Sequence, residues 1–269
     1  AEWYNQKLGI KFPDKKTFFG KRINQLRYGE NPHQKSSIYL SDLKNDKTNL
    51  EHLSGKDLSY NNYNDIFAAL TISKSLPKDS GTVIVKHTNP CGVSILRNSL
   101  KSYKSALACD PLSAFGGVVS CNFRINKGLS LELNKMFLEV IIGNGFDKDA
   151  LKILKKKKNL RLVDATYLKP SDNLKFNSLN ENILMQSEDK MIFKKKDFKI
   201  VSKKKPTKSQ FDNLLFAFNV CRHVKSNAIV LANDLSTVGI GSGQPSRLDS
   251  CKIAIDKMNK FAKIEDEIV

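Results

Sequence analysis

The chain has 269 residues, 40% of them hydrophobic, which is enough for one large or two ordinary globular domains with a buried core. No run of about 18 apolar residues occurs, which excludes a membrane-spanning helix, and the first residues do not have the pattern of a secretory signal. The formal net charge of +18 comes from 38 Lys and 7 Arg spread along the chain. Because this spread is typical of a compositional bias, RNA binding is the less favoured function, and we expect neither a nucleic-acid nor a membrane partner.

The cysteines favour a reducing compartment. They show no Cys-x-x-Cys pair and no close Cys/His cluster, and they lie at Cys91, Cys109, Cys121, Cys221 and Cys251. Reduced thiols in a cytoplasmic protein are the natural interpretation of this odd, scattered set. The chain begins at Ala1 rather than at Met, so we expect it to be a piece of a longer polypeptide.

Residues 1–22 contain glycine and proline without a sustained period, and we interpret them as a connector. Arg27 and Tyr28 then open a loop that Gly29 and the Asn-Pro step at 31–32 keep irregular. An Arg supplies charged donors for a phosphate, and a Tyr supplies a face for a flat heterocycle. The loop suits a nucleotide, with a surface turn around an aromatic anchor as the alternative.

Helices and strands alternate along most of the chain. Helices are predicted at 66–76 after a cap at Asn64 or Asp65, at 100–108, 129–137 and 150–154, after Thr207, and at 246–258. Strands are predicted at 82–85, 118–120, 139–142, 160–163, 228–232 and 238–241. This alternation predicts a layered α/β domain with a largely parallel sheet. The pattern weakens from 170 to 198, and the basic segment at 202–207 indicates a boundary, after which a second unit begins and is not finished.

The strand at 82–85 leads directly into Lys86 and His87, and the segment 89–92 is expected to form a turn. Ligands of open α/β sheets bind outside the carboxyl ends of strands, so this is where a catalytic pair would lie. Adjacent residues of a strand point to opposite faces unless the chain bends, and we expect a bend at His87. The alternative is a strand end that only reaches solvent.

Six motifs in order resemble the transformylase domain of the bifunctional purine-biosynthesis enzymes, which pair AICAR formyltransferase with IMP cyclohydrolase. They are LRYGENPHQ at 26–34, LSYNN at 58–62, KHTNPCG at 86–92, DPLSAFGG at 110–117, KSNAIV at 225–230 and GIGSGQ at 239–244. The resemblance covers the chain from about residue 19 to its end. Any one motif is weak by itself, but the ordered set is specific.

This resemblance implies a three-layer α/β fold made of two cytidine-deaminase-like subdomains, the second of them incomplete. The subdomains would span 23–200 and 201–269, after a connector from an absent cyclohydrolase domain at 1–22. It also implies a homodimer that completes the active sites, and a purine-biosynthesis reaction. In that reaction 10-formyltetrahydrofolate, as co-substrate, gives its formyl group to the 5-amino group of AICAR, forming FAICAR.

The resemblance places Lys86, His87 and Asn227 at the reaction. The 5-amino group is a weak nucleophile, so a base must take its proton and a donor must meet the oxyanion that develops on the formyl group. His87 suits the base and Lys86 the charge stabilisation or protonation of the leaving folate nitrogen. Asn227 would hold the carboxamide or the formyl oxygen, with a polar cap before a strand as the alternative.

Nucleotide contacts carried over by position fall on Arg27, Tyr28, Gly145, Asp164 and Arg247. Arg247 would bind phosphate, or alternatively cap the glycine-rich turn before it. One departure from the family is Arg222-His223, where Lys-Tyr is more usual; we expect it to alter packing rather than chemistry.

A zinc deaminase is the obvious rival, because it shares the expected fold. Such an enzyme needs a Glu two residues after its His ligand and a Pro-Cys-x-x-Cys pair. Asn89 and Ser94 stand at those two positions, so we expect no metal in catalysis.

The family also carries folate-side motifs after the region of Arg247, and these do not occur in the 269 residues. We therefore expect the chain alone to bind AICAR weakly at best and to transfer no formyl group. The alternative functions are a nucleotide-binding fragment without turnover and a basic RNA-binding protein.

Overall fold

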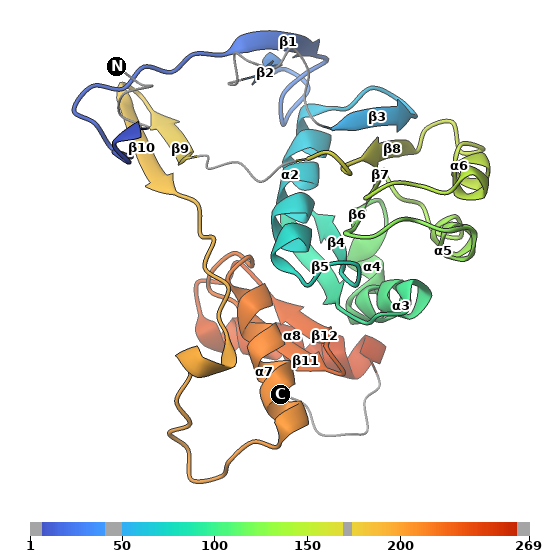
Figure 1. Ribbon diagram of the computed structural model, residues 1–269, viewed down its shortest axis with the longest axis vertical. Coiled ribbons are helices and arrows are strands. Elements are labelled where there is room, and N and C mark those ends of the chain that lie inside the picture. The colour runs from blue at the N-terminus through green and yellow to red at the C-terminus, as the bar shows by residue number, and fades with distance from the viewer. Residues whose placement is uncertain (1–6, 41–49, 169–173, 263–269) are drawn as a thin grey trace.

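The computed structural model describes residues 7–40, 50–168 and 174–262, and its centre is one eight-stranded sheet (Figure 1). The strand order is β11-β12-β5-β4-β6-β7-β8-β3. These strands are β3 (Glu51–Ser54), β4 (Thr82–Lys86), β5 (Asn89–Ser94), β6 (Val118–Cys121), β7 (Val140–Gly143), β8 (Arg161–Asp164), β11 (Ile229–Asn233) and β12 (Ser236–Gly241). Parallel pairing is confined to β6, β7 and β8, and the other neighbours pair antiparallel. The sheet is therefore mixed, and the expectation of a largely parallel sheet holds only for these three strands.

Helices cover both faces of this sheet. They are α2 (Tyr60–Ser75), α3 (Ser99–Cys109), α4 (Pro111–Ala114), α5 (Lys127–Leu133), α6 (Lys148–Leu154), α7 (Lys208–Cys221) and α8 (Arg247–Lys257), with a short 3-10 helix η1 (Lys195–Asp197) and a short π-helix η2 (Met258–Ala262). Along β4, Ile84 joins the core under α3, α5 and α6, whereas Val83 and Val85 join the core under α2 and α7. The expected three-layer α/β architecture is confirmed (Figure 1).

Two small hairpins lie outside the main sheet (Figure 1). One pairs β1 (Lys21–Leu26) with β2 (Ser36–Leu40), and the other pairs β9 (Leu174–Leu179) with β10 (Asn182–Ser187). The ring of Phe18 lies 5.5 Å from that of Phe176, so the segment before β1 contacts the second hairpin. Within the described ranges, the helices are too short or too polar to cross a bilayer.

The start of α2 lies earlier than the sequence predicted. Ser59, rather than Asn64 or Asp65, is the N-cap, because its hydroxyl accepts a hydrogen bond from the Asn62 amide at 3.1 Å. Asn62 Oδ1 in turn accepts a hydrogen bond from the Ser59 amide at 3.1 Å, which completes a capping box. As a result Asp65 lies inside the helix and its side chain is available for another contact.

The expected turn at 89–92 is wrong, because these residues begin β5 and the chain turns two residues earlier. His87 and Thr88 have φ angles of 51° and 63°, so the bend expected at His87 is confirmed. Asn, Pro and Gly suggested a turn because they are the usual turn residues. Here Pro90 lies where the β4–β5 register shifts, a place where a residue without an N–H is tolerated.

The hairpin β4–β5, with the helices before and after it, is repeated in the second part of the chain. The series α2-β4-β5-α3 corresponds to α7-β11-β12-α8. The turn residues are His87 and Thr88 in the first hairpin, and Asp234 and Leu235, with φ of 44° and 51°, in the second. In both units the helix before the hairpin holds the second turn residue: Asp65 accepts a bond from the Thr88 amide at 2.7 Å, and Asn213 accepts one from Leu235 at 2.8 Å.

The repeat extends to the packing of the following helix on the strand. A Cβ added to Gly92 of β5 would lie 1.8 Å from the carbonyl oxygen of Ala106 in α3. A Cβ added to Gly239 of β12 would lie 2.1 Å from the carbonyl oxygen of Ala254 in α8. Both strands therefore need glycine, because the helix backbone occupies the place of a side chain.

The two units join where β12 lies beside β5. Ser236 pairs with Ser94, and their hydroxyls are 2.9 Å apart. Thr237 Oγ1 accepts a bond from the Val93 amide at 2.9 Å. The main sheet thus continues from the first unit into the second. The domain boundary near residue 200 stays a prediction, and the repeat supports it.

Candidate active site

The turn that carries Lys86 and His87 is held in an unusual backbone conformation. Thr88 is β-branched, and a positive φ is costly for such a residue, by about 1–3 kcal/mol. Lys86 Nζ donates a hydrogen bond to the carbonyl oxygen of Phe115 at 2.6 Å. His87 is exposed, while Lys86 is half-buried. Both side chains are therefore presented at the end of β4 next to the start of β6.

Asp65 of α2 supports this turn from the helix layer. Its Oδ1 accepts the Thr88 amide hydrogen. Burial raises the pKa of Asp65 above its ordinary value, and it outweighs the lowering by the turn amides and by the charges of His87 and Lys86. A half-buried carboxyl group thus fixes the strained turn and lies within the electrostatic field of the two candidate catalytic side chains.

Asn89 connects this turn to a distant segment of the chain. Its Nδ2 donates to the carbonyl oxygen of His87 at 3.1 Å, and its Oδ1 accepts a bond from the Lys225 amide at 3.2 Å. Lys225 lies two residues before Asn227 in the KSNAIV motif. The segment with Asn227 is therefore brought to the same edge of the sheet as His87.

Asn227 is fixed by bonds to the loop before α8. Its Nδ2 donates to the carbonyl oxygens of Gln244 at 3.0 Å and Pro245 at 2.8 Å. Within the described part of the chain, no hydrogen bond to its Oδ1 is formed, so this oxygen remains available to accept one. The same loop leads to Ser246, which caps α8, and to the exposed Arg247. Among the described residues Arg247 forms no hydrogen bond to the glycine-rich turn, and it lies exposed in the first turn of α8.

The loop of Arg27 and Tyr28 reaches this edge through α2. The Arg27 guanidinium lies 5.7 Å from the centre of the Tyr28 ring. The carbonyl oxygen of Glu30 accepts a bond from Asn61 Nδ2 at 3.2 Å, in the first turn of α2 and one turn before Asp65. A chain of contacts thus runs from the Arg27 loop through α2 to the turn of His87.

Gly145 and Asp164 lie at the opposite edge of the sheet. Because β4 is antiparallel to β6, Val85 at the carboxyl end of β4 pairs with Val118 at the amino end of β6. Gly145 and Asp164 lie at the carboxyl ends of β7 and β8, which are parallel to β6. Four strand residues separate these edges by roughly 10–13 Å. Within one chain the structure does not bring these two residues together with Lys86.

A comparison with protein families then relates this arrangement to known proteins. The family model described as "AICARFT/IMPCHase bienzyme" matches residues 1–257. The chain belongs to the AICARFT/IMPCHase bienzyme family.

Several curated relatives are named bifunctional purine biosynthesis protein PurH. The chain is 42% identical over 261 residues to the one from Leptospira biflexa, covering 97% of this chain and 50% of that protein. It is 42% identical over 267 residues to the one from Bradyrhizobium diazoefficiens, with 97% and 50% covered, and 41% identical over 264 residues to the one from Persephonella marina, with 96% and 51% covered. The chain spans about half the length of these relatives.

Sequence reasoning missed an aromatic pair beside Lys86. The ring centres of Phe115 and Phe137 lie 5.3 Å apart, and both residues are largely exposed, Phe115 to 58% and Phe137 to 48%. A Cβ added to Gly116 would lie 3.9 Å from Lys86 Nζ, which places this pair next to the ammonium group. In this member of the AICARFT/IMPCHase family, the available signal was the Phe-Gly-Gly step of the DPLSAFGG motif, which directly follows α4.

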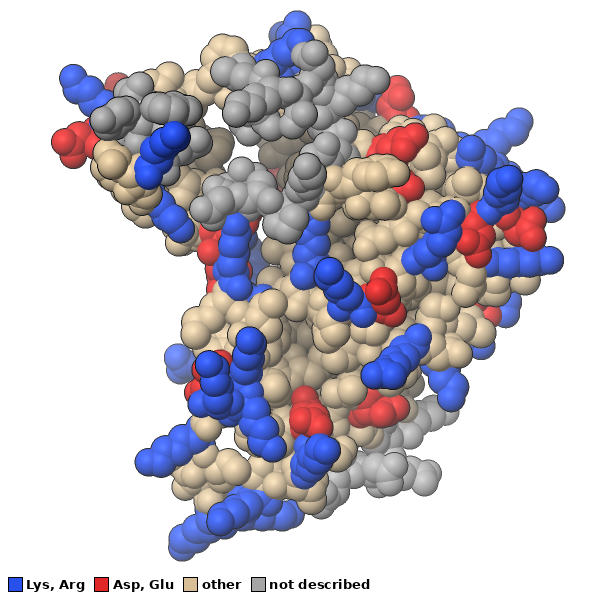
Figure 2. All heavy atoms as spheres, in the orientation of Figure 1, with Lys and Arg blue, Asp and Glu red and all other residues tan. Residues whose placement is uncertain are grey.

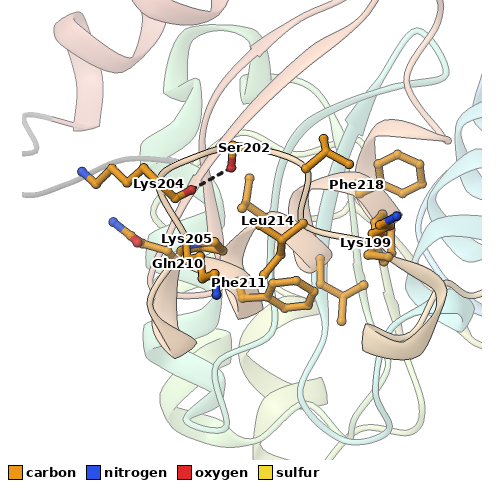
Figure 3. A pocket seen from close by; sticks show the side chains of 13 residues that line it. Lys199, Ser202, Lys204, Lys205, Gln210, Phe211, Leu214 and Phe218 are labelled. Atoms are coloured by element: carbon orange, nitrogen blue, oxygen red, sulfur yellow. Dashed lines mark hydrogen bonds between the residues drawn. The ribbon is translucent and has the colours of Figure 1, made fainter.

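A second feature that the sequence did not indicate is a groove between residues 198–206 and α7 (Figure 3). It has a volume of about 540 Å³ and is lined largely by apolar side chains, among them Phe211, Leu214 and Phe218. None of the eight predicted site residues lines it.

The distribution of charge and of metal-binding residues bears on the rival functions. On the face in Figure 2, Lys and Arg are spread over many elements, with Asp and Glu between them. The described ranges hold no group of three or more His, Cys, Asp or Glu side chains arranged to bind a metal. At the positions where a zinc deaminase has its Glu and its second Cys, this chain has Asn89 and Ser94. Asn89 forms hydrogen bonds with His87 and Lys225, and Ser94 forms one with Ser236.

Proposed function

We propose that this chain carries the formyltransferase site of its family. The reaction would transfer a formyl group from 10-formyltetrahydrofolate to the 5-amino group of AICAR and give FAICAR, a step of purine biosynthesis in a protein that also carries IMP cyclohydrolase. The observation that supports this proposal best is the series of contacts from Glu30 to Asn61, from Asp65 to Thr88, from Asn89 to Lys225 and from Asn227 to Pro245. These contacts link, one after another, the segments that carry six of the eight residues predicted from the sequence.

In this mechanism His87 takes a proton from the amino group of AICAR as its nitrogen attacks the formyl carbon. The new C–N bond forms, and the carbonyl electrons move to the formyl oxygen. Lys86 Nζ, fixed by its bond to Phe115, keeps two further N–H groups that can stabilise this oxyanion. When the oxyanion collapses, the bond between the formyl carbon and N10 of the folate breaks with its electron pair leaving on N10, and N10 receives the proton that His87 took up.

The remaining residues of this edge suit the two substrates. Arg27 and Arg247 offer exposed guanidinium groups for the phosphate of AICAR, and Tyr28 offers a ring. Asn227 Oδ1 can accept a hydrogen bond from the carboxamide of AICAR. The exposed rings of Phe115 and Phe137 next to Lys86 suit the aromatic part of the folate, since stacking needs only an accessible face.

We also propose a cytoplasmic homodimer, in which Gly145 and Asp164 serve a site completed by the partner. Their position at the edge opposite Lys86 supports this reading, because the structure does not bring these two residues together with Lys86 within one chain. The hairpin β9–β10 offers exposed apolar side chains for such a contact, with Phe176 59% and Leu184 74% exposed. Sedimentation equilibrium that finds only monomers at tens of micromolar protein would contradict the dimer.

A calorimetric titration of AICAR into the 269-residue chain tests the proposed site. We expect measurable but weak binding, which Arg27→Ala and Arg247→Ala each weaken about tenfold because each removes a charge-assisted bond to phosphate. Arg97→Ala, an exposed arginine before α3, is the matched control and should bind as the wild type does. Unchanged affinity in both arginine variants, or tighter binding of a single-stranded RNA than of AICAR, would favour the rival functions.

A further inference from the structure

The two hairpins of the repeat differ at the residue that follows each turn. In the first hairpin Asn89 Nδ2 donates to the carbonyl oxygen of His87 at 3.1 Å. In the second, Ser236 Oγ donates to the carbonyl oxygen of Asp234 at 3.2 Å. Both side chains make the same contact across the turn. A hydroxyl is therefore sufficient to close a turn of this geometry.

The amide of Asn89 makes a further contact that the hydroxyl of Ser236 does not. Asn89 Oδ1 accepts the Lys225 amide hydrogen at 3.2 Å, which joins parts of the chain 136 residues apart. Ser236 instead bonds to Ser94 where the two units meet. Comparison of the two hairpins therefore separates two contacts of Asn89. The contact across the turn is shared with Ser236, whereas the hydrogen bond to the segment of Asn227 is made by Asn89 and not by Ser236.

This link acts on a segment whose other side is already fixed. The amide of Gly243 donates to the carbonyl oxygen of Lys225 at 2.7 Å, and Asn227 is bonded to Gln244. The loop before α8 therefore holds this segment from one side, and Asn89 holds it from the side of the His87 turn. The separation of His87 and Asn227 depends on both.

We propose that Asn89 is a positioning residue that sets the separation between His87 and Asn227 for formyl transfer. The proposal rests on the proposed function of this site. Displacements of about 1 Å between reacting groups can cost about 100-fold in rate. Loss of the link should act on kcat more than on KM, because Arg27 lies on another segment and Arg247 is held by α8, on the side of the Asn227 segment that Asn89 does not contact.

Asn89→Ser in the full-length natural protein is the decisive variant, because serine keeps the turn contact, as Ser236 does, and loses the acceptor for Lys225. We expect kcat for formyl transfer to fall about 10- to 100-fold with the KM for AICAR within about threefold of wild type. Hydrogen exchange at the Lys225 amide should become about tenfold faster or more. Ser236→Ala is the matched control: it removes the same turn contact from the second hairpin and should lower thermal stability without changing kcat or KM.

A kcat within twofold of wild type in Asn89→Ser would overturn the proposal, as would unchanged exchange at Lys225. Asn89→Asp keeps the acceptor and gives up the donor, so it should keep the Lys225 amide protected even if Asn89→Ser folds poorly. An Asn89→Asp chain that folds but leaves Lys225 unprotected would also contradict the proposal. If the wild-type protein transferred no formyl group, the proposed function would fail, and with it the role of Asn89 in formyl transfer. Hydrogen exchange at the Lys225 amide would still decide whether Asn89 holds the segment of Asn227.

Discussion

Because the pKa of His223 is lowered, we expect the stability of this protein to fall as the pH falls. Its Nε2 lies 3.1 Å from the Ser75 hydroxyl at the end of α2, in a half-buried position. Burial, and then the charge of Arg222, lower the pKa of His223 from 6.5 to about 4, and the opposing effect of Asp189 is smaller. Since the unfolded chain keeps the ordinary pKa, it binds a proton first as the pH falls, so the contribution of this residue to stability is complete above about pH 6.5 and is lost towards pH 4.

The size of this effect follows from the shift. One pKa unit corresponds to about 1.4 kcal/mol, so the difference between 6.5 and about 4 gives up to about 3 kcal/mol, less whatever solvent screens. His223→Gln keeps a hydrogen-bonding group for Ser75 and removes the titration. Urea unfolding of both proteins between pH 7 and pH 4 should show the wild type losing about 2–3 kcal/mol more than the variant.

His52→Gln is the matched control, because His52 is exposed on β3. Its stability should follow the wild-type pH dependence. Parallel curves of unfolding free energy against pH for wild type and His223→Gln would refute the reasoning, since they would mean that His223 is not kept neutral by its surroundings.

Three further predictions concern the site and the packing around it. Purified protein should contain no stoichiometric zinc by elemental analysis, because Asn89 and Ser94 replace the glutamate and second cysteine of the deaminases; one zinc per chain would revive that rival. Gly92→Ala should destabilise the fold by roughly 3 kcal/mol or more in denaturant unfolding, because its Cβ would lie 1.8 Å from the Ala106 carbonyl oxygen; a loss under about 1 kcal/mol would mean that α3 can move away from β5. Asp65→Asn should keep the hydrogen bond to the turn at 87–88, as the equivalent Asn213 does in the second hairpin, whereas Asp65→Ala should lower the free energy of unfolding by about 1–3 kcal/mol. Equal losses in the two variants would contradict the supporting role of this side chain.

Local patterns in the sequence were sufficient for most elements. The helix after Thr207 begins as predicted, with Thr207 and Gln210 forming a capping box, and the β-branched run at 82–85 is a fully buried strand. These features depend on neighbouring residues alone. The turn at 87–88 was harder to predict in detail, because β-branched Thr88 disfavours a positive φ and the turn is held by Asp65 from another element.

The arrangement of the site could be predicted only in part. The motifs identified Lys86, His87 and Asn227, but the bond from Asn89 to Lys225 joins positions too far apart for spacing to reveal. The rule that sites lie at the carboxyl ends of strands was applied as if the whole sheet were parallel. Because β4 is antiparallel to β6, the carboxyl ends of β4 and β7 lie at opposite edges, which separates Gly145 from Lys86.

Formyl transfer by the full-length natural protein tests the central claim most directly. Turnover of AICAR with 10-formyltetrahydrofolate should fall roughly 100-fold or more in His87→Ala and in Lys86→Ala, with the Kd for AICAR within a few-fold of wild type. Lys101→Ala, an exposed lysine of α3, should leave turnover unchanged. Near-normal turnover in both His87→Ala and Lys86→Ala would contradict the account and would place the reaction elsewhere on the protein.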